Sequence, residues 1–159
     1  MNKLTHEALM REAIRLSIEN VTLGVGGPFA ALVARDGEII ATGTNQVTTL
    51  HDPTAHAEVS AIRTACRALQ TFELRGCDLY TTCEPCPMCL GAIYWARLER
   101  LYFGNTRTDA ADIGFDDAFI YNEIPLDFSA RKIPTQQLLR DDALAAFRAW
   151  QHSTTKKPY

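Results

Sequence analysis

The chain has 159 residues, of which 47% are hydrophobic, and its formal net charge is −3. This length predicts one domain with a sizeable core, and no apolar run approaches the roughly 20 residues of a helical membrane span. The acidic balance argues against nucleic-acid binding, which usually depends on a basic patch.

The first predicted element is an amphipathic helix over residues 5–19. Its apolar residues recur at helical spacing on one face and on an adjoining face, namely Leu9, Ala13 and Leu16, then Met10, Ile14 and Ile18. The glycine-rich loop 24–28 follows. Phosphate binding is not indicated there, because neither a lysine nor a helix follows the glycines.

A β-hairpin is predicted next, with strands over residues 29–35 and 38–44. Asp36-Gly37 between them is a strong signal for a tight hairpin turn. Asn45 follows the second strand, where an asparagine is typically a turn residue.

The middle of the chain predicts two helices, over residues 55–70 and 86–97, alternating with strands over 78–82 and 101–105. Pro53 and Thr54 suit the start of the first helix. The second helix has almost no polar face, which predicts that it is buried. Trp95 is therefore expected mainly in the core.

The C-terminal third is less regular. Residues 108–112 and 118–123 are helix-prone, 136–139 give a weak fifth strand, and Asp141 is expected to cap a last helix. A linker-like segment and Tyr159 end the chain. The order of elements predicts an α/β fold, a three-layer α/β/α sandwich with a mixed sheet of about five strands.

Two short motifs predict a metal site. His56-Ala57-Glu58 lies upstream of Cys83, and Pro85-Cys86-Pro87-Met88-Cys89 follows it. One imidazole and two thiolates suit a catalytic zinc, which typically has three protein ligands and an open fourth position. The chain has five cysteines, an odd number, and three of them lie close together. We therefore expect no disulfide framework, and we expect a cytoplasmic location.

The spacing of these residues predicts two helix starts that face one metal. Cys86 and Cys89 are three apart and share one side of a first helical turn, where the positive helix end favours the thiolate. His56 and Glu58 are two apart, so they reach one site only at the first turn of a second helix. Glu58 is the candidate general acid/base.

Three other interpretations compete with a catalytic zinc. The Cys-x-x-Cys pair is also typical of redox proteins. Cys83 would serve as a fourth ligand in a closed structural site. A glutamate at a helix start often interacts only with the helix dipole, which is the interpretation we adopt for Glu84 but not for Glu58.

The His-x-Glu and Pro-Cys-x-x-Cys motifs resemble the signature of zinc-dependent nucleobase deaminases. Longer runs are similar to bacterial guanine deaminases. These runs are residues 52–58, 83–96 and 108–117 and the terminal Lys-Lys-Pro-Tyr. The resemblance covers nearly the whole chain. It implies a single cytidine deaminase-like domain over 1–159, with 152–159 as a tail over the active site, and a homodimer.

The resemblance further implies zinc-dependent hydrolysis of guanine, a small purine base, to xanthine and ammonia. It implies Zn²⁺ ligation by His56, Cys86 and Cys89, with Glu58 carrying the proton. Residues that it implies at the substrate are Phe29, Asn45, Ala57, Trp95, Asp117 and Tyr159. A carboxylate at Asp117, chosen over Asp116, would accept from the N–H groups of guanine.

Other functions remain open from the sequence. A tRNA adenosine deaminase shares the zinc core, although the acidic charge and the Gly114-Phe115-Asp116-Asp117 stretch argue against it. A cytosine deaminase is the next alternative. A non-catalytic zinc-stabilised domain would recruit Cys83 as a fourth protein ligand.

Overall fold

The computed structural model describes residues 3–159, which form two compact units over residues 3–117 and 118–159. Each unit is described by itself. The larger unit carries the whole sheet and both predicted zinc motifs. The expectation of one deaminase domain with a covering tail stays a prediction.

A mixed sheet organises the larger unit. Its strands are β1 (Ala30–Arg35), β2 (Glu38–Thr44), β3 (Asp78–Cys83) and β4 (Arg100–Asn105), in the order β2-β1-β3-β4. β1 pairs antiparallel with β2 and β3, whereas β3 and β4 are parallel. The predicted hairpin and the mixed sheet are confirmed. The parallel pair directs residues after Cys83 and Asn105 to the same edge.

The predicted fifth strand at 136–139 is wrong, because the described residues form a sheet of four strands and 136–139 are irregular. Four residues offer few ladder hydrogen bonds, and strand propensity depends strongly on the available neighbours. The count of about five strands is corrected to four.

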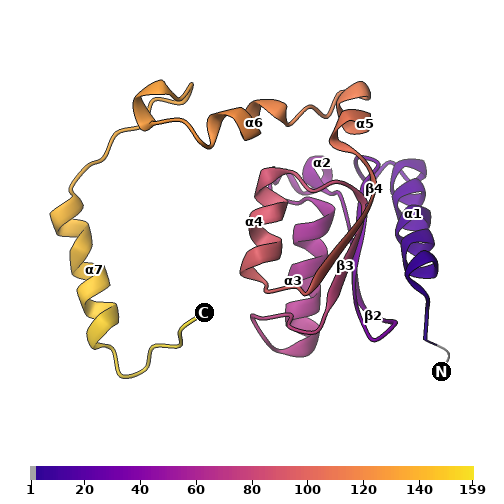
Figure 1. Ribbon diagram of the computed structural model, residues 1–159, viewed down its shortest axis with the longest axis horizontal. Coiled ribbons are helices and arrows are strands. Elements are labelled where there is room, and N and C mark those ends of the chain that lie inside the picture. Colours follow the sequence, from indigo (N-terminus) through magenta and orange to yellow (C-terminus); the bar gives the residue numbers. More distant parts are fainter. Residues whose placement is uncertain (1–2) are drawn as a thin grey trace. The chain divides into compact units, whose positions relative to one another are not determined.

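Helices cover both faces of the sheet in the larger unit (Figure 1). α1 (His6–Thr22) lies on one face, and α3 (Ala57–Leu69) and α4 (Pro87–Trp95) lie on the other. Gly43 in β2 allows α3 to approach closely, because a Cβ there would lie 2.4 Å from the Ala57 carbonyl oxygen. This contact sets the start of α3, where the first zinc motif lies.

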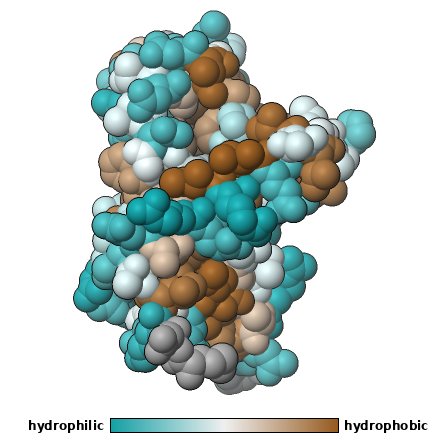
Figure 2. Space-filling view, turned by 90° about the vertical axis from the view of Figure 1, so that its right-hand side faces the viewer, coloured by the Kyte–Doolittle hydropathy of each residue, from teal (hydrophilic) through white to brown (hydrophobic). Residues whose placement is uncertain are grey.

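α1 buries one of its two apolar faces. Thr5 caps the helix by accepting from the N–H of Ala8. The buried residues, spaced three or four apart, are Leu9, Ala13, Ser17 and Asn20. Ile14 and Ile18 on the adjoining face are exposed. α1 lies on the side that Figure 2 faces, where a hydrophobic band runs beside a hydrophilic one.

α4 is not the fully buried helix that its composition predicts. Cys89 and Ile93 are buried, but Tyr94 is 76% exposed and Trp95 is 68% exposed. The expectation that Trp95 belongs to the core is therefore wrong. An apolar helix can lie at the surface of a single chain when that surface is an interaction face.

Short helices connect and follow the sheet. α2 (Val47–Leu50) was not predicted, while α5 (Arg107–Asp112) and α6 (Ala118–Glu123) were. Thr106 and Asp109 form a reciprocal capping box at the start of α5. Across the described chain, no helix has the combined length and apolar character that crossing a membrane requires.

The smaller unit contains α6, a 3₁₀ turn (Phe128–Ala130) and α7 (Arg140–His152). α7 begins after Leu139, which has a left-handed backbone, so the prediction that Asp141 caps it is wrong and Asp141 lies in its first turn. Arg131 donates to the carbonyls of Leu126 and Ile124. No residue of 118–159 is buried.

Candidate metal centre

The predicted metal-binding residues lie at the starts of two helices. His56 is the N-cap of α3, and Cys86 is the N-cap of α4 with Cys89 one turn further along. Both caps have extended backbones, and Pro87 at the first helical position favours the start of α4. Two helix N-termini thus face one point, as the spacing predicts.

The three ligand atoms fit a zinc ion. The Nδ1 atom of His56 lies 3.6 Å from the Cys86 sulfur and 3.5 Å from the Cys89 sulfur. All three atoms lie within 4.8 Å of one another. Tetrahedral zinc with ordinary Zn–S and Zn–N bonds separates sulfur from nitrogen by about 3.5 Å. Among the described residues, this set of one His and two Cys is the group that could hold a metal ion.

The protonation of the cluster reflects its hydrogen bonds. Hydrogen bonding with Cys89, and then with His56, lowers the pKa of Cys86 to about 4, so this thiol is ionised at neutral pH. Hydrogen bonding to Cys86 and burial raise the pKa of Cys89. The Cys86 sulfur likewise raises the pKa of His56. A metal cation would displace the protons of Cys89 and His56.

Glu58 lies against the cluster and is only 6% exposed. The Cys89 thiol donates to its Oε2 atom at 3.4 Å. Burial raises the pKa of this carboxyl group, so it takes up a proton more readily than an exposed glutamate does. A carboxyl group with this environment beside a metal position can accept and return a proton.

Cys83 does not join the metal cluster. It ends β3, and its thiol donates to the carbonyl oxygen of Thr106 at 3.7 Å. Burial raises its pKa to about 11, which keeps the thiol protonated. Its sulfur is not among the ligand atoms of His56, Cys86 and Cys89 that lie within 4.8 Å of one another. The closed four-ligand site is therefore not favoured.

Asn45 is buried at the end of β2, and its amide orientation is fixed. Its Oδ1 atom accepts from the N–H of Gly27 at 3.3 Å and from that of Val47 at 3.4 Å. The side chain therefore offers its Nδ2 group, a donor, to any further partner. Gly26 permits this packing, because a Cβ there would lie 2.1 Å from the Asn45 carbonyl oxygen.

An aromatic pair links the glycine loop to the acidic stretch after α5. The rings of Phe29 and Phe115 meet edge to face with centroids 4.9 Å apart. Asp117 follows two residues later and is partly buried. Burial, and then the Cys86 thiolate, raise its pKa. Glu84 instead accepts from the backbone N–H of Arg107, which is a structural role.

Of the other predicted substrate residues, Ala57 lies beside the metal cluster, whereas Trp95 and Tyr159 are exposed. Ala57 is fully buried between His56 and Glu58, at the first turn of α3. Trp95 lies at the exposed end of α4. Tyr159 belongs to the smaller unit and is 70% exposed, so its substrate role stays a prediction.

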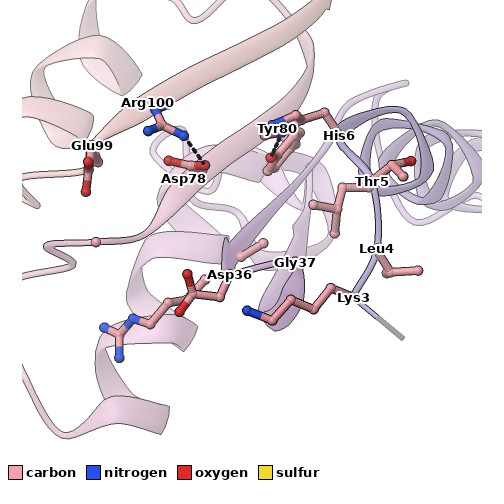
Figure 3. Close-up of a pocket in the computed structure, with 14 residues that line it drawn as sticks. Lys3, Leu4, Thr5, His6, Asp36, Gly37, Asp78, Tyr80, Glu99 and Arg100 are labelled. Atoms are coloured by element: carbon pink, nitrogen blue, oxygen red, sulfur yellow. Dashed lines mark hydrogen bonds and ion pairs between the residues drawn. The ribbon is translucent and has the colours of Figure 1, made fainter. Parts of the chain in front are cut away.

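A hollow of about 660 Å³ lies where β3 and β4 begin (Figure 3). Cys86 and Cys89 of the metal cluster instead follow the opposite end of β3. Asp78 and Arg100, on the adjacent strands β3 and β4, form an ion pair at 3.8 Å beside it, and the Tyr80 hydroxyl lies 2.6 Å from Nδ1 of His6. Its charged groups are of both signs, and it is separate from the candidate site.

Sequence reasoning missed Asn20 and the requirement for Gly26. Asn20 lies on the buried face of α1, with Nδ2 at 2.8 Å from the Gly27 carbonyl and 2.9 Å from the Asn45 carbonyl. The available signal was a polar residue in register with Leu9 and Ala13 on the face that packs against the sheet. A polar side chain at such a position needs buried partners.

Comparison with known families gives a match over residues 3–105 to the cytidine and deoxycytidylate deaminase zinc-binding region. The match contains His56, Glu58, Cys86 and Cys89. The chain is also 51% identical to guanine deaminase from Bacillus subtilis (strain 168), over 98% of this chain and all of that protein.

Solved structures agree with this match. The structure of the guanine deaminase from Bacillus subtilis superposes with a TM-score of 0.96, at 51% identity, and covers 98% of this chain and 99% of that one. A guanine deaminase from Nitrosomonas europaea gives a TM-score of 0.71 at 34% identity, covering 93% and 85%.

A tRNA-specific adenosine deaminase from Agrobacterium fabrum is similar over a smaller region. It is 51% identical to this chain over 77 residues, which are 48% of this chain and 51% of that protein. The similarity to tRNA deaminases of this kind is thus partial, whereas the similarity to the guanine deaminases extends over most of both chains.

Proposed function

Because the chain belongs to the cytidine and deoxycytidylate deaminase zinc-binding family, we propose that it is a zinc-dependent guanine deaminase, which hydrolyses guanine to xanthine and ammonia. The observation that carries this proposal is the match to a guanine deaminase along nearly the whole chain, with a complete His56, Cys86 and Cys89 cluster beside Glu58.

His56, Cys86 and Cys89 would hold the zinc ion. When bound, zinc supplies Lewis acidity and lowers the pKa of a water molecule, which is the chemistry that hydrolysis of an amino group needs. Glu58 takes a proton at a carboxylate oxygen, passes it to a ring nitrogen of guanine and then delivers a proton to the departing amino group. Its burial beside Cys89 supports this role, because the raised pKa suits both acceptance and return.

Asn45 and Asp117 orient the base in this proposal. The fixed amide of Asn45 presents a donor, which suits the O6 or N7 acceptor of guanine. Asp117 is an acceptor when ionised and suits the N–H groups on another edge of the base. Guanine then presents C2, and not its C6 carbonyl, to the reacting water.

The aromatic and apolar residues exclude water around the base. Phe29 is supported by Phe115 and forms one wall. Ala57 contributes backbone close to the metal ligands, and Trp95 and Tyr159 are proposed as further contacts on the basis of the family resemblance. In this proposal, the tail over 152–159 closes a site.

A homodimer in the cytoplasm is part of the proposal. No residue of 118–159 is buried, and Phe147 and Trp150 of α7 are exposed, as are Ile14 and Ile18 of α1. Exposed apolar surface on this scale is commonly covered in an oligomer. The thiolate ligands suit a reducing compartment. Light scattering should give the mass of a dimer, and the mass of a monomer would contradict the proposed homodimer.

The main alternative is a tRNA adenosine deaminase. To discriminate, zinc-loaded protein is offered guanine, adenine, cytosine and a tRNA separately while released ammonia is measured. We expect ammonia from guanine. Ammonia release from tRNA alone, with RNA binding that weakens steeply as salt rises, would show that the substrate is tRNA and would leave the proposed zinc chemistry unchanged. Release from cytosine alone would favour a cytosine deaminase.

A further inference from the structure

We propose that Asn20 of α1 is a positioning residue for the substrate site. Its side chain fixes the backbone of Asn45 and of the Gly26-Gly27 loop relative to each other. This inference rests on the proposed function, in which Asn45 contacts the base. The side-chain hydrogen bonds of Asn20 go to the backbone of Gly27 and Asn45, and not to the candidate metal-binding residues.

The side-chain amide of Asn20 joins three segments of the chain. Asn20 is 4% exposed and lies near the end of α1. Its Nδ2 group has two protons. One is donated to the carbonyl of Gly27 at 2.8 Å and the other to the carbonyl of Asn45 at 2.9 Å. Both donor sites are therefore used on backbone that belongs to the candidate substrate site.

Both accepting carbonyls are held by further contacts, one steric and one a hydrogen bond. The Asn45 carbonyl lies so close to Gly26 that a Cβ on that glycine would be 2.1 Å from its oxygen. The Gly27 carbonyl also accepts from the N–H of Phe29 at 2.8 Å. Asn20 therefore adds a second donor to the Gly27 carbonyl, and it donates to the Asn45 carbonyl in a bond that is buried.

The orientation of the Asn45 amide depends on this arrangement. The N–H of Gly27 donates to Oδ1 of Asn45, while the carbonyl of the same residue accepts from Asn20. Gly27 is thus held from both sides. If Asn20 no longer anchors it, the Gly27 N–H can leave Oδ1. Only the N–H of Val47 then holds the Asn45 amide, which rotates its donor away from the base more readily.

The test compares Asn20→Asp and Asn20→Ala with Ser17→Ala. Asn20→Asp preserves shape but places acceptors against two carbonyls, whereas Asn20→Ala removes the side chain. Ser17 is the matched control, because it is 7% exposed on the same face of α1 and donates only within its helix, to Ile14. A loss of packing in α1 would affect all three variants.

We expect both Asn20 variants to raise KM for guanine by about 5–10-fold, the effect of one lost hydrogen bond, with kcat per bound zinc within about 3-fold of the parent. Ser17→Ala should leave KM unchanged. An unchanged KM in both Asn20 variants, or an equal rise in Ser17→Ala, would overturn the proposal. If Asn20→Asp does not fold, Asn20→Ala decides.

Amide hydrogen exchange tests the same inference without activity. The N–H groups of Gly27 and Val47 should exchange at least several-fold faster in the Asn20 variants than in Ser17→Ala, because both groups donate to Oδ1 of Asn45. Unchanged exchange at both groups would contradict the proposal. Absence of guanine turnover in the parent protein would refute the proposed function, but exchange would still decide whether Asn20 orients Asn45.

Discussion

The sulfur of Cys89 lies 3.4 Å from Oε2 of Glu58, and both side chains are buried. They come from different helices, α4 and α3, so their contact joins the two halves of the candidate site. The carboxyl group that we assign to proton transfer is thereby placed beside one of the three metal-binding atoms. The first prediction follows from this contact.

Glu58→Gln should keep the metal and lose turnover. The amide has nearly the shape of the carboxyl group, but it cannot accept and return a proton, so kcat should fall by about 10²–10⁴-fold. Zinc content and ammonia release are measured on the same preparation. Glu84→Gln is the control, because that carboxylate bonds the N–H of Arg107. Near-normal kcat in Glu58→Gln with stoichiometric zinc would refute the assigned role.

Asp117→Asn should weaken the handling of guanine without affecting zinc. The substitution turns part of an acceptor into a donor, which opposes the N–H groups of the base, so kcat/KM should fall by about 10-fold or more. Asp116→Asn is the matched control, because Asp116 is the more exposed of the two aspartates. A larger loss in Asp116→Asn would show that the other aspartate binds the base.

Gly26→Ala should disturb the substrate site through the backbone. The added methyl group would meet the Asn45 carbonyl oxygen at 2.1 Å, and relieving the clash should cost about 1–3 kcal/mol of stability and raise KM. Gly91→Ala in α4 is the control, because its Cβ would have no atom within 4 Å. That variant should gain up to about 1 kcal/mol from helix propensity. Thermal unfolding and guanine kinetics together provide the measurement.

Cys89→Ser should lose zinc, whereas Cys83→Ser should retain it. Cys83 bonds Thr106 and lies outside the cluster. In the parent protein, zinc at about 100 times its Kd should add roughly 2.7 kcal/mol of stability. Because the pKa of Cys89 and that of His56 are raised, zinc must displace protons, and its apparent affinity should rise with pH. Zinc loss in Cys83→Ser would instead support the interpretation of a structural site with four protein ligands.

The sequence was sufficient to predict that the candidate metal-binding residues lie together, because each of them has a local signal. His56, Cys86 and Cys89 are specified by spacing and by helix starts, and the structure brings their ligand atoms together. The hairpin at Asp36-Gly37 and the alternation of helices and strands likewise depend on neighbouring residues.

What the sequence did not predict depends on distant partners. Asn20 donates to the carbonyl of Asn45, 25 residues away, and nothing in the sequence of α1 indicates this partner. The uniformly apolar composition of α4 indicated burial, yet Tyr94 and Trp95 are exposed, since composition does not say whether one chain or two covers a surface. The weak strand at 136–139 lacks a neighbour within its unit.

The most direct test of the account is the product formed from guanine by zinc-loaded protein in H₂¹⁸O. We predict xanthine and ammonia in equal amounts, with one ¹⁸O atom in each xanthine, because water replaces the amino group at C2. Glu58→Gln should form neither at a comparable rate. If stoichiometrically zinc-loaded parent protein leaves guanine unchanged, the assignment of guanine deamination is contradicted.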